Sequence, residues 1–569
     1  MKKQILIPFF AVTLLFGCDI NRLPEDSVTP ENYFQTETDL QLWCNGFYTM
    51  FPAANTTAGM DADDVLDNSL SDYLAGTRSP STESGWSWGQ LRRINYLFEH
   101  LDNCSDERVR ARYEGVAHFF RAWFYFEKVR RYGDVPWYDY VPGSTDETLY
   151  KARDDRGTVM DKVMEDFDAA AALLPADVDV TRVNKWSALA FQSRAALFEG
   201  TYRKYHGLDG ADRYLQIAAD AARQVIASGK YALSTSGATP YRSLFHADDA
   251  NTGEFLLARI YSGDLSIFHS IQQMILNERR GFTKRFMNHY LMADGSRICD
   301  QPGYETMTYY EETQKRDPRM AQTVLCPGYV QVGATTKTAN QLISRTGYQP
   351  IKFVAEAAHN LANQSISDFP LMRLAEVYLN YAEALAELGT LTQSQLDESV
   401  NRIRSRAGMP ALKLAEANAD PDPLLVRYYP HVTQSPNTGV ILEIRRERTV
   451  EMVMEGLRHW DMIRWKEGAQ MVNTPNPWYG CYFPGTGKFD MDGDGKDDIE
   501  IYSGSATSSL SAKFLLGTDI FLSNGTSGYV VAYSGNAYTW DEDRDYLWPI
   551  PTSQMELNEN LSQNTGWGK

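Results

Sequence analysis

The fold of this chain is decided by the stretch Ala117-His118-Phe119-Phe120-Arg121-Ala122-Trp123-Phe124-Tyr125-Phe126, which runs into Tyr132-Gly133-Asp134-Val135-Pro136. Val116, Phe119, Phe120 and Trp123 recur at the spacing of one helix face, and Phe124 and Phe126 add apolar area on another. A helix that is apolar over so much of its circumference is packed on two sides. The stretch therefore predicts a helix buried between neighbouring elements.

Helical patterns continue outward from this stretch and come in pairs. One apolar stripe ends at Gly389, and the chain restarts at Thr392-x-x-Gln395, a capping box, and runs on to Gly408. Two helices joined by so short a connection are expected to lie antiparallel. The stripe consists of Leu371, Leu374, Tyr378, Tyr381, Leu385 and Leu388. We expect such hairpins near 111–175, 183–228, 367–408 and 438–468.

The segments between and after the hairpins have a different composition. Residues 231–360 and 469–545 are rich in Gly, Ser, Thr, Asn and Tyr and show little periodicity. They predict long loops and short strands, and loops on a rigid frame usually carry recognition. The predicted fold is mainly α, with about four tetratricopeptide-like helix pairs under a loop-rich region with short strands.

The start of the chain predicts export. Lys2 and Lys3 precede the apolar run 5–16, which is too short to cross a bilayer and is typical of a secretory signal peptide. Leu15-Phe16-Gly17-Cys18 resembles a lipobox, although Phe16 is an imperfect residue there. We expect residues 1–17 to be removed and Cys18 to carry acyl chains that anchor the protein. The alternative is an ordinary signal with a chance cysteine.

Composition limits the partners. The formal net charge of −19 and the pI of about 5.0 argue against nucleic acid as a partner. Aromatic residues make up 12% of the chain, a surplus that suits stacking on flat ligands, although most of the rings will fill the core. Five further cysteines without a C-x-x-C pair argue against a zinc site or a disulfide scaffold, and any pairing stays open: Cys44, Cys104, Cys299, Cys326 and Cys481.

Several motifs in order along the chain resemble the SusD/RagB family of outer-membrane nutrient-binding lipoproteins. The first is the F-R-A-x-x-Y-F and Y-G-D-V-P block already quoted. The others are Arg316-Asp317-Pro318-Arg319, Asp368-Phe369-Pro370-Leu371-Met372-Arg373-Leu374-Ala375-Glu376-Val377-Tyr378-Leu379, the helix pair from Glu443 to Glu455-Gly456-Leu457-Arg458-His459-Trp460-Asp461, Tyr546-Leu547-Trp548-Pro549-Ile550-Pro551, and Asn560-Leu561-Ser562-Gln563-Asn564.

The resemblance implies an N-terminal region over 18–235 and a C-terminal region with ligand-binding insertions over 236–569. It also implies a surface lipoprotein that delivers an oligosaccharide to a SusC-like TonB-dependent outer-membrane barrel. A peptide importer of the RagB kind is the alternative. A glycoside hydrolase is a further one, but the chain contains no H-E-x-x-H, G-x-S-x-G or phosphate loop, and we predict no enzyme and no required cofactor.

The charged residues of these motifs lie among apolar helix positions. A buried charge needs a partner, so Arg121, Asp134, Glu443, Arg446 and Arg458 predict structural ion pairs between helices. The ladder Glu443, Glu447, Glu451 and Glu455 has interleaved arginines and no E-x-x-H, so we expect a solvated or salt-bridged face and no metal site.

A sugar site needs exposed rings and planar polar groups. One segment without helical patterning supplies both, and Trp86 is its favoured stacking ring: Asp72, Tyr73, Arg78, Trp86, Trp88, Arg92 and Asn95. The family resemblance implies that the loop before the helix in this segment contacts glycan. Leu91 stands where the family has an aromatic residue, so core packing is the alternative for Trp88 and Asn95. A second candidate cluster, which core packing could also explain, is Phe282, Phe286, Tyr304, Tyr309 and Tyr310.

The acidic loop from Asp490 to Asp498 resembles the D-x-D-x-D-G-x-x-D loops of extracellular repeat proteins. Carboxylates at positions 1, 3, 5 and 9 with Gly495 at position 6 fit Ca²⁺. The ligands would be Asp490, Asp492, Asp494, Asp498 and the Lys496 carbonyl, without the bidentate glutamate of an EF-hand. The predicted role is to stiffen the 469–545 insertion; a solvated acidic turn is the alternative.

Overall fold

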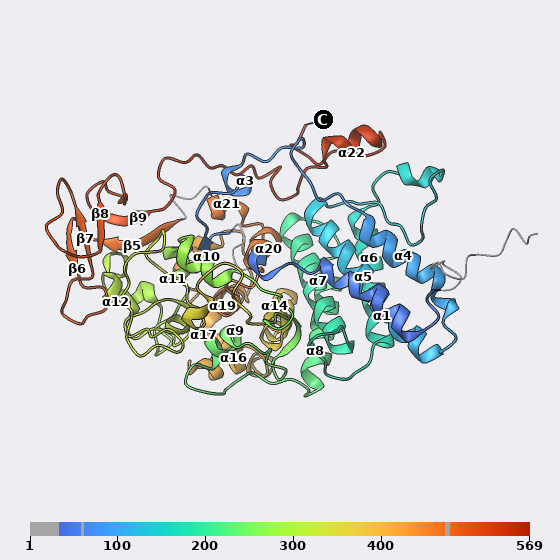
Figure 1. Ribbon diagram of the computed structural model, residues 1–569, viewed down its shortest axis with the longest axis horizontal. Coiled ribbons are helices and arrows are strands. Elements are labelled where there is room, and N and C mark those ends of the chain that lie inside the picture. Colours follow the sequence, from blue (N-terminus) through green and yellow to red (C-terminus); the bar gives the residue numbers. More distant parts are fainter. Residues whose placement is uncertain (1–32, 58–61, 473–477, 569) are drawn as a thin grey trace, which may run out of the picture.

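The computed structural model describes residues 33–57, 62–472 and 478–568, so the predicted signal peptide and Cys18 lie outside the described residues. Helices pair along the chain (Figure 1). The first pairs are α5 (Glu107–Tyr132) with α6 (Arg156–Leu173), and α7 (Lys185–His206) with α8 (Ala211–Ala227). Next come α14 (Leu374–Leu388), which packs on α8, and α19 (Thr438–Glu451), which packs on α14. The predicted helical-hairpin scaffold is confirmed.

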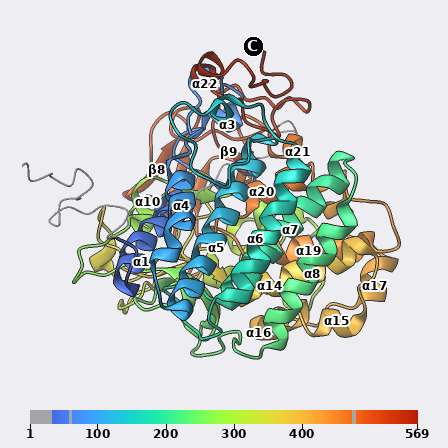
Figure 2. The same ribbon diagram turned by 90° about the vertical axis from the view of Figure 1, so that its right-hand side faces the viewer.

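Helix α5 is the buried helix that its sequence predicts. Asp106 accepts the N–H groups of Arg108 and Val109 at its start, and Gly133, with φ +74°, follows its last residue. Phe120 and Phe126, on the two apolar faces, have at most 1% of their surface exposed. The helix contacts α6 as well as α1 (Glu37–Asn45) and α4 (Gly89–His100), and Figure 2 shows these helices side by side.

The third predicted hairpin needs two corrections. The helix starts at Leu374, not Leu371, because Phe369–Arg373 forms β4, which pairs antiparallel with β2 (Phe255–Arg259). Pro370 lacks a backbone donor, and the ladder with β2 stabilises the extended conformation. The second helix is split into α15 (Gln393–Asp397) and α16 (Val400–Ala407), because Ser399 adopts a non-helical ψ of −95°. The capping box at Thr392 and the left-handed ends at Gly389 and Gly408 are confirmed.

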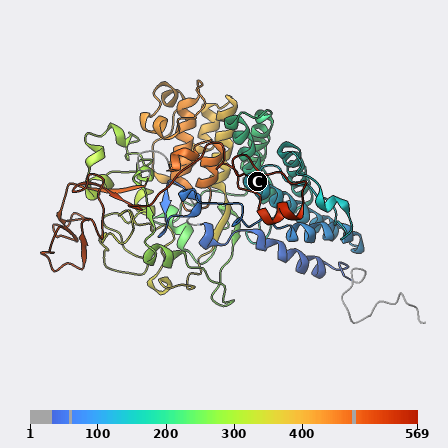
Figure 3. The ribbon, with the colours of Figure 1, turned by 90° about the horizontal axis from the view of Figure 1, so that it is seen from above.

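The loop-rich insertions carry only short strands, as predicted. β5 (Tyr479–Phe483) pairs antiparallel with β9 (Gly528–Val531). β7 (Ile499–Tyr502) pairs antiparallel with β6 (Gly487–Phe489) and parallel with β8 (Ala512–Leu515). Figure 3 shows these strands at one end of the molecule and the first helix pairs at the other.

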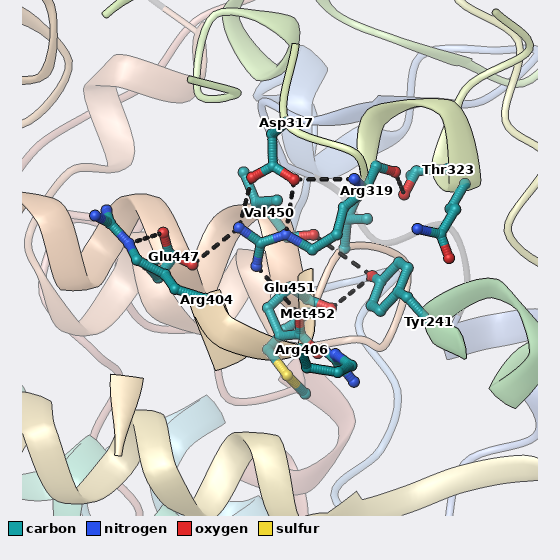
Figure 4. A network of polar contacts seen from close by, with 12 residues as sticks. Tyr241, Asp317, Arg319, Thr323, Arg404, Arg406, Glu447, Val450, Glu451 and Met452 are labelled. Carbon is teal, nitrogen blue, oxygen red and sulfur yellow. Dashed lines mark hydrogen bonds and ion pairs between the residues drawn. The ribbon is translucent and has the colours of Figure 1, made fainter. Parts of the chain in front are cut away.

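A buried ion network joins the insertions to the helices (Figure 4). Glu447 of α19 pairs with Arg319 of the insertion at 3.0 Å and with Arg404 of α16 at 2.6 Å. Glu451 pairs with Arg319, Arg373 and Arg406. The salt-bridged interpretation of the glutamate ladder is confirmed and the solvated one is wrong, because Glu447 and Glu451 are at most 1% exposed.

The other motif charges behave similarly, with one exception. Arg121 pairs with Asp166 of α6 at 2.7 Å, and Arg458, at the start of α20 (Arg458–Arg464), pairs with Asp63 at 2.6 Å. Asp134 forms no ion pair with a described cation; its carboxylate accepts the N–H of Arg156 at 2.9 Å and thereby caps α6. Asp134 therefore has a structural role, as expected, but it acts by capping a helix and not by forming an ion pair.

Two further findings bear on the sequence predictions. The five described cysteines are all free thiols, so the described ranges contain no disulfide. In those same ranges, no helix is long and apolar enough to traverse a bilayer. The hydrophobic core around the helices draws residues from both sides of position 235, so the boundary between the two predicted regions stays a prediction.

Candidate ligand-binding groove

A surface cavity of about 350 Å³ lies between α4, the segment 136–150 and α22 (Thr552–Leu557). The three elements are far apart in the sequence, and the side chain of Asn558 holds two of them together by donating to the carbonyl of Lys151 at 3.1 Å. A cavity of this volume suits a small ligand or one to two sugar rings.

Aromatic rings form the floor and one wall of the groove. Trp88 lies edge-on to Trp86, with ring centroids 5.4 Å apart, and Trp86 packs in turn on Tyr132 at 5.0 Å. At the rim, the exposed fractions of Tyr140 and Tyr150 are 38% and 53%. Aromatic rings that are held by packing and still exposed on one side can stack on the C–H face of a flat ligand.

The polar groups of the groove are few. Asn95 is 1% exposed, and its Nδ2 donates to the carbonyls of Tyr138 and Tyr140 at 3.0 Å each. Its Oδ1 has no hydrogen-bond partner among the described residues. Arg92 is exposed and donates to the carbonyl of Pro142 at 3.0 Å. A buried amide oxygen without a donor costs free energy that a ligand hydroxyl would recover.

The structure brings together four of the residues singled out in the first segment: Trp86, Trp88, Arg92 and Asn95. Trp86, predicted to be the stacking ring, is only 8% exposed and contributes mainly to the floor. Sequence reasoning missed Tyr138, Tyr140 and Tyr150. The run Trp137-Tyr138-Asp139-Tyr140 directly after the Tyr132–Pro136 motif was a signal for the first two; no sequence pattern marks Tyr150.

Asp72, Tyr73 and Arg78 lie outside the groove. The guanidinium of Arg78 pairs with Asp545 at 2.9 Å and sits 4.2 Å from the ring centroid of Tyr73, which is 4% exposed. The carboxylate of Asp72 accepts the Thr77 hydroxyl at 2.7 Å. Tyr73 and Arg78 thus join the N-terminal region to the C-terminal segment, and the ring of Tyr73 is not available to a ligand.

The mid-chain aromatic cluster is mostly core. Three of its rings are at most 2% exposed: Phe282, Phe286 and Tyr309. Tyr304 is half-buried and its hydroxyl contacts Glu305 and Arg427. Tyr310 is 38% exposed and lies against the acidic loop, where a Cβ added to Gly493 would be 2.3 Å from its ring.

The acidic loop connects β6 to β7. Asp490, Asp492 and Asp494 each bring one carboxylate oxygen within 4.8 Å of the others. Asp490 also accepts the N–H groups of Gly493 and Gly495 at 2.6 and 2.7 Å. Asp498 turns to the N–H of Met491 at 2.8 Å, and burial, together with the three nearby aspartates, raises its pKa although that N–H lowers it. Lys496 pairs with Asp494 at 3.1 Å. Three of the four predicted carboxylates therefore converge.

Stacked helix pairs that present an aromatic, partly polar groove form a scaffold for binding a small ligand. Residues 278–567, just over half of the chain, match the model of the SusD family. Residues 86–197 match a second model, described as starch-binding associating with outer membrane. The chain belongs to the SusD family.

Individual relatives agree with this assignment. SusD-like protein P2 of Formosa agariphila is 23% identical over 506 residues, which cover 84% of this chain and 93% of the relative. A SusD-like protein of Bacteroides fragilis superimposes with a TM-score of 0.69 at 21% identity, covering 96% of this chain and all of that one. A SusD-like carbohydrate binding protein of the same species gives a TM-score of 0.67 at 20% identity, covering 93% and 99%. At these identities the solved structures support the fold.

Proposed function

We propose that this protein is a cell-surface lipoprotein that binds an oligosaccharide in the aromatic groove and delivers it to a SusC-like TonB-dependent outer-membrane transporter. The observation that carries the proposal is the groove lined by Asn95, Tyr140 and Tyr150. Asn95 Oδ1 has no hydrogen-bond donor among the described residues, and the two tyrosine rings are exposed. A family model described as starch-binding and a solved neighbour described as carbohydrate binding support it.

The groove suits a sugar for physical reasons. A pyranose ring has an apolar C–H face that can lie on Tyr140 or Tyr150, and hydroxyls that can donate to Asn95 Oδ1 or accept from Arg92. Binding is proposed without catalysis. Hydrolysis of a glycosidic bond needs two carboxylates about 5–10 Å apart, and no acidic residue is among the described residues that line the groove.

The test is calorimetric titration of the purified protein with a panel of neutral oligosaccharides and of peptides. We expect saturable binding of an oligosaccharide, weakened by roughly 1–3 kcal/mol in Tyr150→Ala because one stacking ring is lost. Phe268→Ala is the matched control, because Phe268 is a 37% exposed ring that does not line the groove. Binding of peptides alone would favour a RagB-like peptide importer. New reducing ends during incubation would show an enzyme.

The anchor is proposed from the lipobox-like residues, with Cys18 as the acylated residue. Two or more acyl chains bury enough CH₂ groups, at about 0.8 kcal/mol each, for stable attachment to the outer membrane. Growth with labelled palmitate should label the wild-type protein and not Cys18→Ser. Unlabelled wild-type protein recovered free of membranes would contradict the anchor.

A structural Ca²⁺ in the acidic loop is also proposed. The convergence of Asp490, Asp492 and Asp494 supports it, because three carboxylate oxygens this close repel one another unless a cation lies between them. The ion would stiffen the turn between β6 and β7; it is assigned no part in binding the sugar.

A further inference from the structure

A second cavity, of about 210 Å³, lies at the other end of the molecule from the groove. It is formed by Arg279, which follows α10 (Ile271–Asn277), by the loop around Ser344 and Arg345, and by β8, β9 and the residues after each of them. In Figures 1 and 3, β8 and β9 lie at one end of the long axis and α4 at the other, so the two cavities are separate sites.

Two arginines from different segments share this cavity. Neither Arg279 nor Arg345 forms an ion pair with a carboxylate of the described residues, whereas buried arginines such as Arg373 are multiply paired. Arg279 donates through Nε to the carbonyl of Ile343 at 3.2 Å. Arg345 donates through Nη2 to the carbonyl of Asn68 at 2.5 Å and to its Oδ1 at 3.1 Å. Burial and the charge of Arg345 lower the pKa of Arg279, although the carboxylate of Asp519 raises it.

One carboxylate, that of Asp519, also lines the cavity, and its Oδ2 accepts the N–H of Leu515 at 2.8 Å. Two positive charges therefore face one negative charge there, in a chain whose formal net charge is −19. The cavity is a local exception to the acidic character of the chain.

Two polar groups beside the cavity have no hydrogen-bond partner among the described residues. Ser344 is 2% exposed, and its Oγ has no hydrogen-bond partner among the described residues. The buried Nε of Arg345 also lacks one. Arg279 adopts a φ of +60°, a left-handed conformation that costs free energy for a side chain larger than glycine and is found preferentially at functional sites.

Aromatic rings complete the cavity. Phe521 is 39% exposed beside the two arginines, and the guanidinium of Arg345 lies 5.3 Å from the ring centroid of Tyr533. The cavity thus combines a ring for stacking with a pair of planar cationic donors. A guanidinium donates two parallel hydrogen bonds to a carboxylate or a sulfate better than to a neutral hydroxyl.

We infer that this cavity binds an acidic sugar unit, with its carboxylate or sulfate ester between Arg279 and Arg345 and its ring against Phe521. The inference rests on the proposed glycan-binding function and adds a second subsite with a charge preference. An acidic glycan would engage the protein here, while the aromatic groove between α4 and α22 holds another part of the same glycan or a different one.

The test is titration of the full-length mature protein with an oligogalacturonide in its free-acid form, with the same oligosaccharide fully methyl-esterified, and with a sulfated galactan oligosaccharide. We expect the free acid or the sulfated sugar to bind at least about tenfold more tightly than the methyl ester, because only charged groups accept the bidentate bonds. Whether the carboxylated or the sulfated sugar binds more tightly identifies the anion. Methyl ester binding as tightly as both anionic sugars would overturn the inference.

The variant is Arg279→Asn, because asparagine tolerates a positive φ and removes the guanidinium. It should weaken binding of the anionic sugar by about tenfold and leave neutral glycan binding unchanged. Arg223→Asn, at an exposed arginine of α8, is the control for the change in net charge and should have no effect. Equal losses in both variants would show non-specific attraction and overturn the inference. Binding of neutral glycans alone would overturn it and leave the proposed function standing; no binding of any glycan would overturn both.

Discussion

Arg373 Nη1 lies 2.7 Å from Glu451 Oε1, and neither side chain has any exposed surface. Arg373 is the last residue of β4 and directly precedes α14, and Glu451 is the last residue of α19. Arg373 also pairs with Glu455 at 2.7 Å and with Glu254 at 3.1 Å. One guanidinium therefore fixes the loop-rich region, the short β2–β4 sheet and two scaffold helices relative to one another.

Replacing this arginine should destabilise the whole fold. Arg373→Met leaves Glu254, Glu451 and Glu455 buried with too few cationic partners, so we expect the free energy of unfolding to fall by roughly 3–5 kcal/mol. Chemical denaturation measures the loss. The control is Lys413→Met, because Lys413 and Glu416 form a pair whose side chains are 64% and 70% exposed and such pairs contribute about 0–1 kcal/mol. Equal effects of the two substitutions would contradict a structural role for the network.

Acid should unfold the protein through the same network. Burial by itself would raise the pKa of Glu447 and Glu451, but the surrounding arginines, among them Arg319, hold both pKa values below their ordinary range. A depressed pKa in the folded state contributes stability above the ordinary value of about 4.3, and this stability is lost as the pH falls below it.

Between about pH 5 and pH 3 the melting temperature should therefore fall, most steeply below about pH 4.3. Differential scanning calorimetry over this range measures the profile. A melting temperature that stays constant down to pH 3 would show that the network does not hold its glutamates ionised.

Asp64 should have the opposite pH dependence. Burial and the neighbouring charge of Asp63 raise its pKa to about 7, although Arg458 and the N–H of Val65 lower it. Because the pKa of Asp64 is higher in the folded state, its protonated form stabilises the fold. This contribution is fully present below the ordinary aspartate pKa of about 3.9 and is lost as the pH rises to about 7. Asp64→Asn keeps an acceptor for Val65 and removes the charge.

We expect Asp64→Asn to raise the free energy of unfolding by roughly 1–3 kcal/mol at pH 8 and by less at pH 5. Denaturant titrations at the two pH values give the comparison. Asp264→Asn, at an exposed aspartate, should change neither value. A gain that is the same at both pH values would show that the charge of Asp64 is not its cause.

Calcium should stabilise the acidic loop. In millimolar Ca²⁺ we expect calorimetry to show one bound ion per chain. Proteolysis of the 469–545 insertion should be slower than in EGTA, because an ion that binds only the folded loop makes its local unfolding less frequent. Asp492→Asn should abolish both effects. Asp543→Asn, at an exposed aspartate of the same insertion but outside the acidic loop, should preserve them. Identical behaviour of the wild-type protein in Ca²⁺ and in EGTA would show that the loop is a solvated turn.

The sequence by itself determined the helix pairs and their ends. Apolar periodicity placed α5, and the capping box at Thr392 and the glycines at positions 389 and 408 placed helix boundaries correctly. These features are local, since a helix closes its hydrogen bonds within four residues and its caps within a turn. The ion pairing of the motif charges, with the exception of Asp134, also followed from sequence, because a charge among apolar positions needs a partner.

Only the tertiary structure decided the groove and the strand at 369–373. Leu371 carries the same apolar pattern as the helix after it, and it is extended because β2 pairs with its backbone. The groove joins Trp88, Tyr150 and Leu557, which come from three distant segments, so no local pattern marks it. Trp86 was the ring that the sequence favoured for stacking, but its packing on Tyr132 buries it. The exposed rings are those of Tyr140 and Tyr150. The exposure of a side chain depends on which residues pack against it. Many of these residues are distant along the chain, and a single sequence does not show which they are.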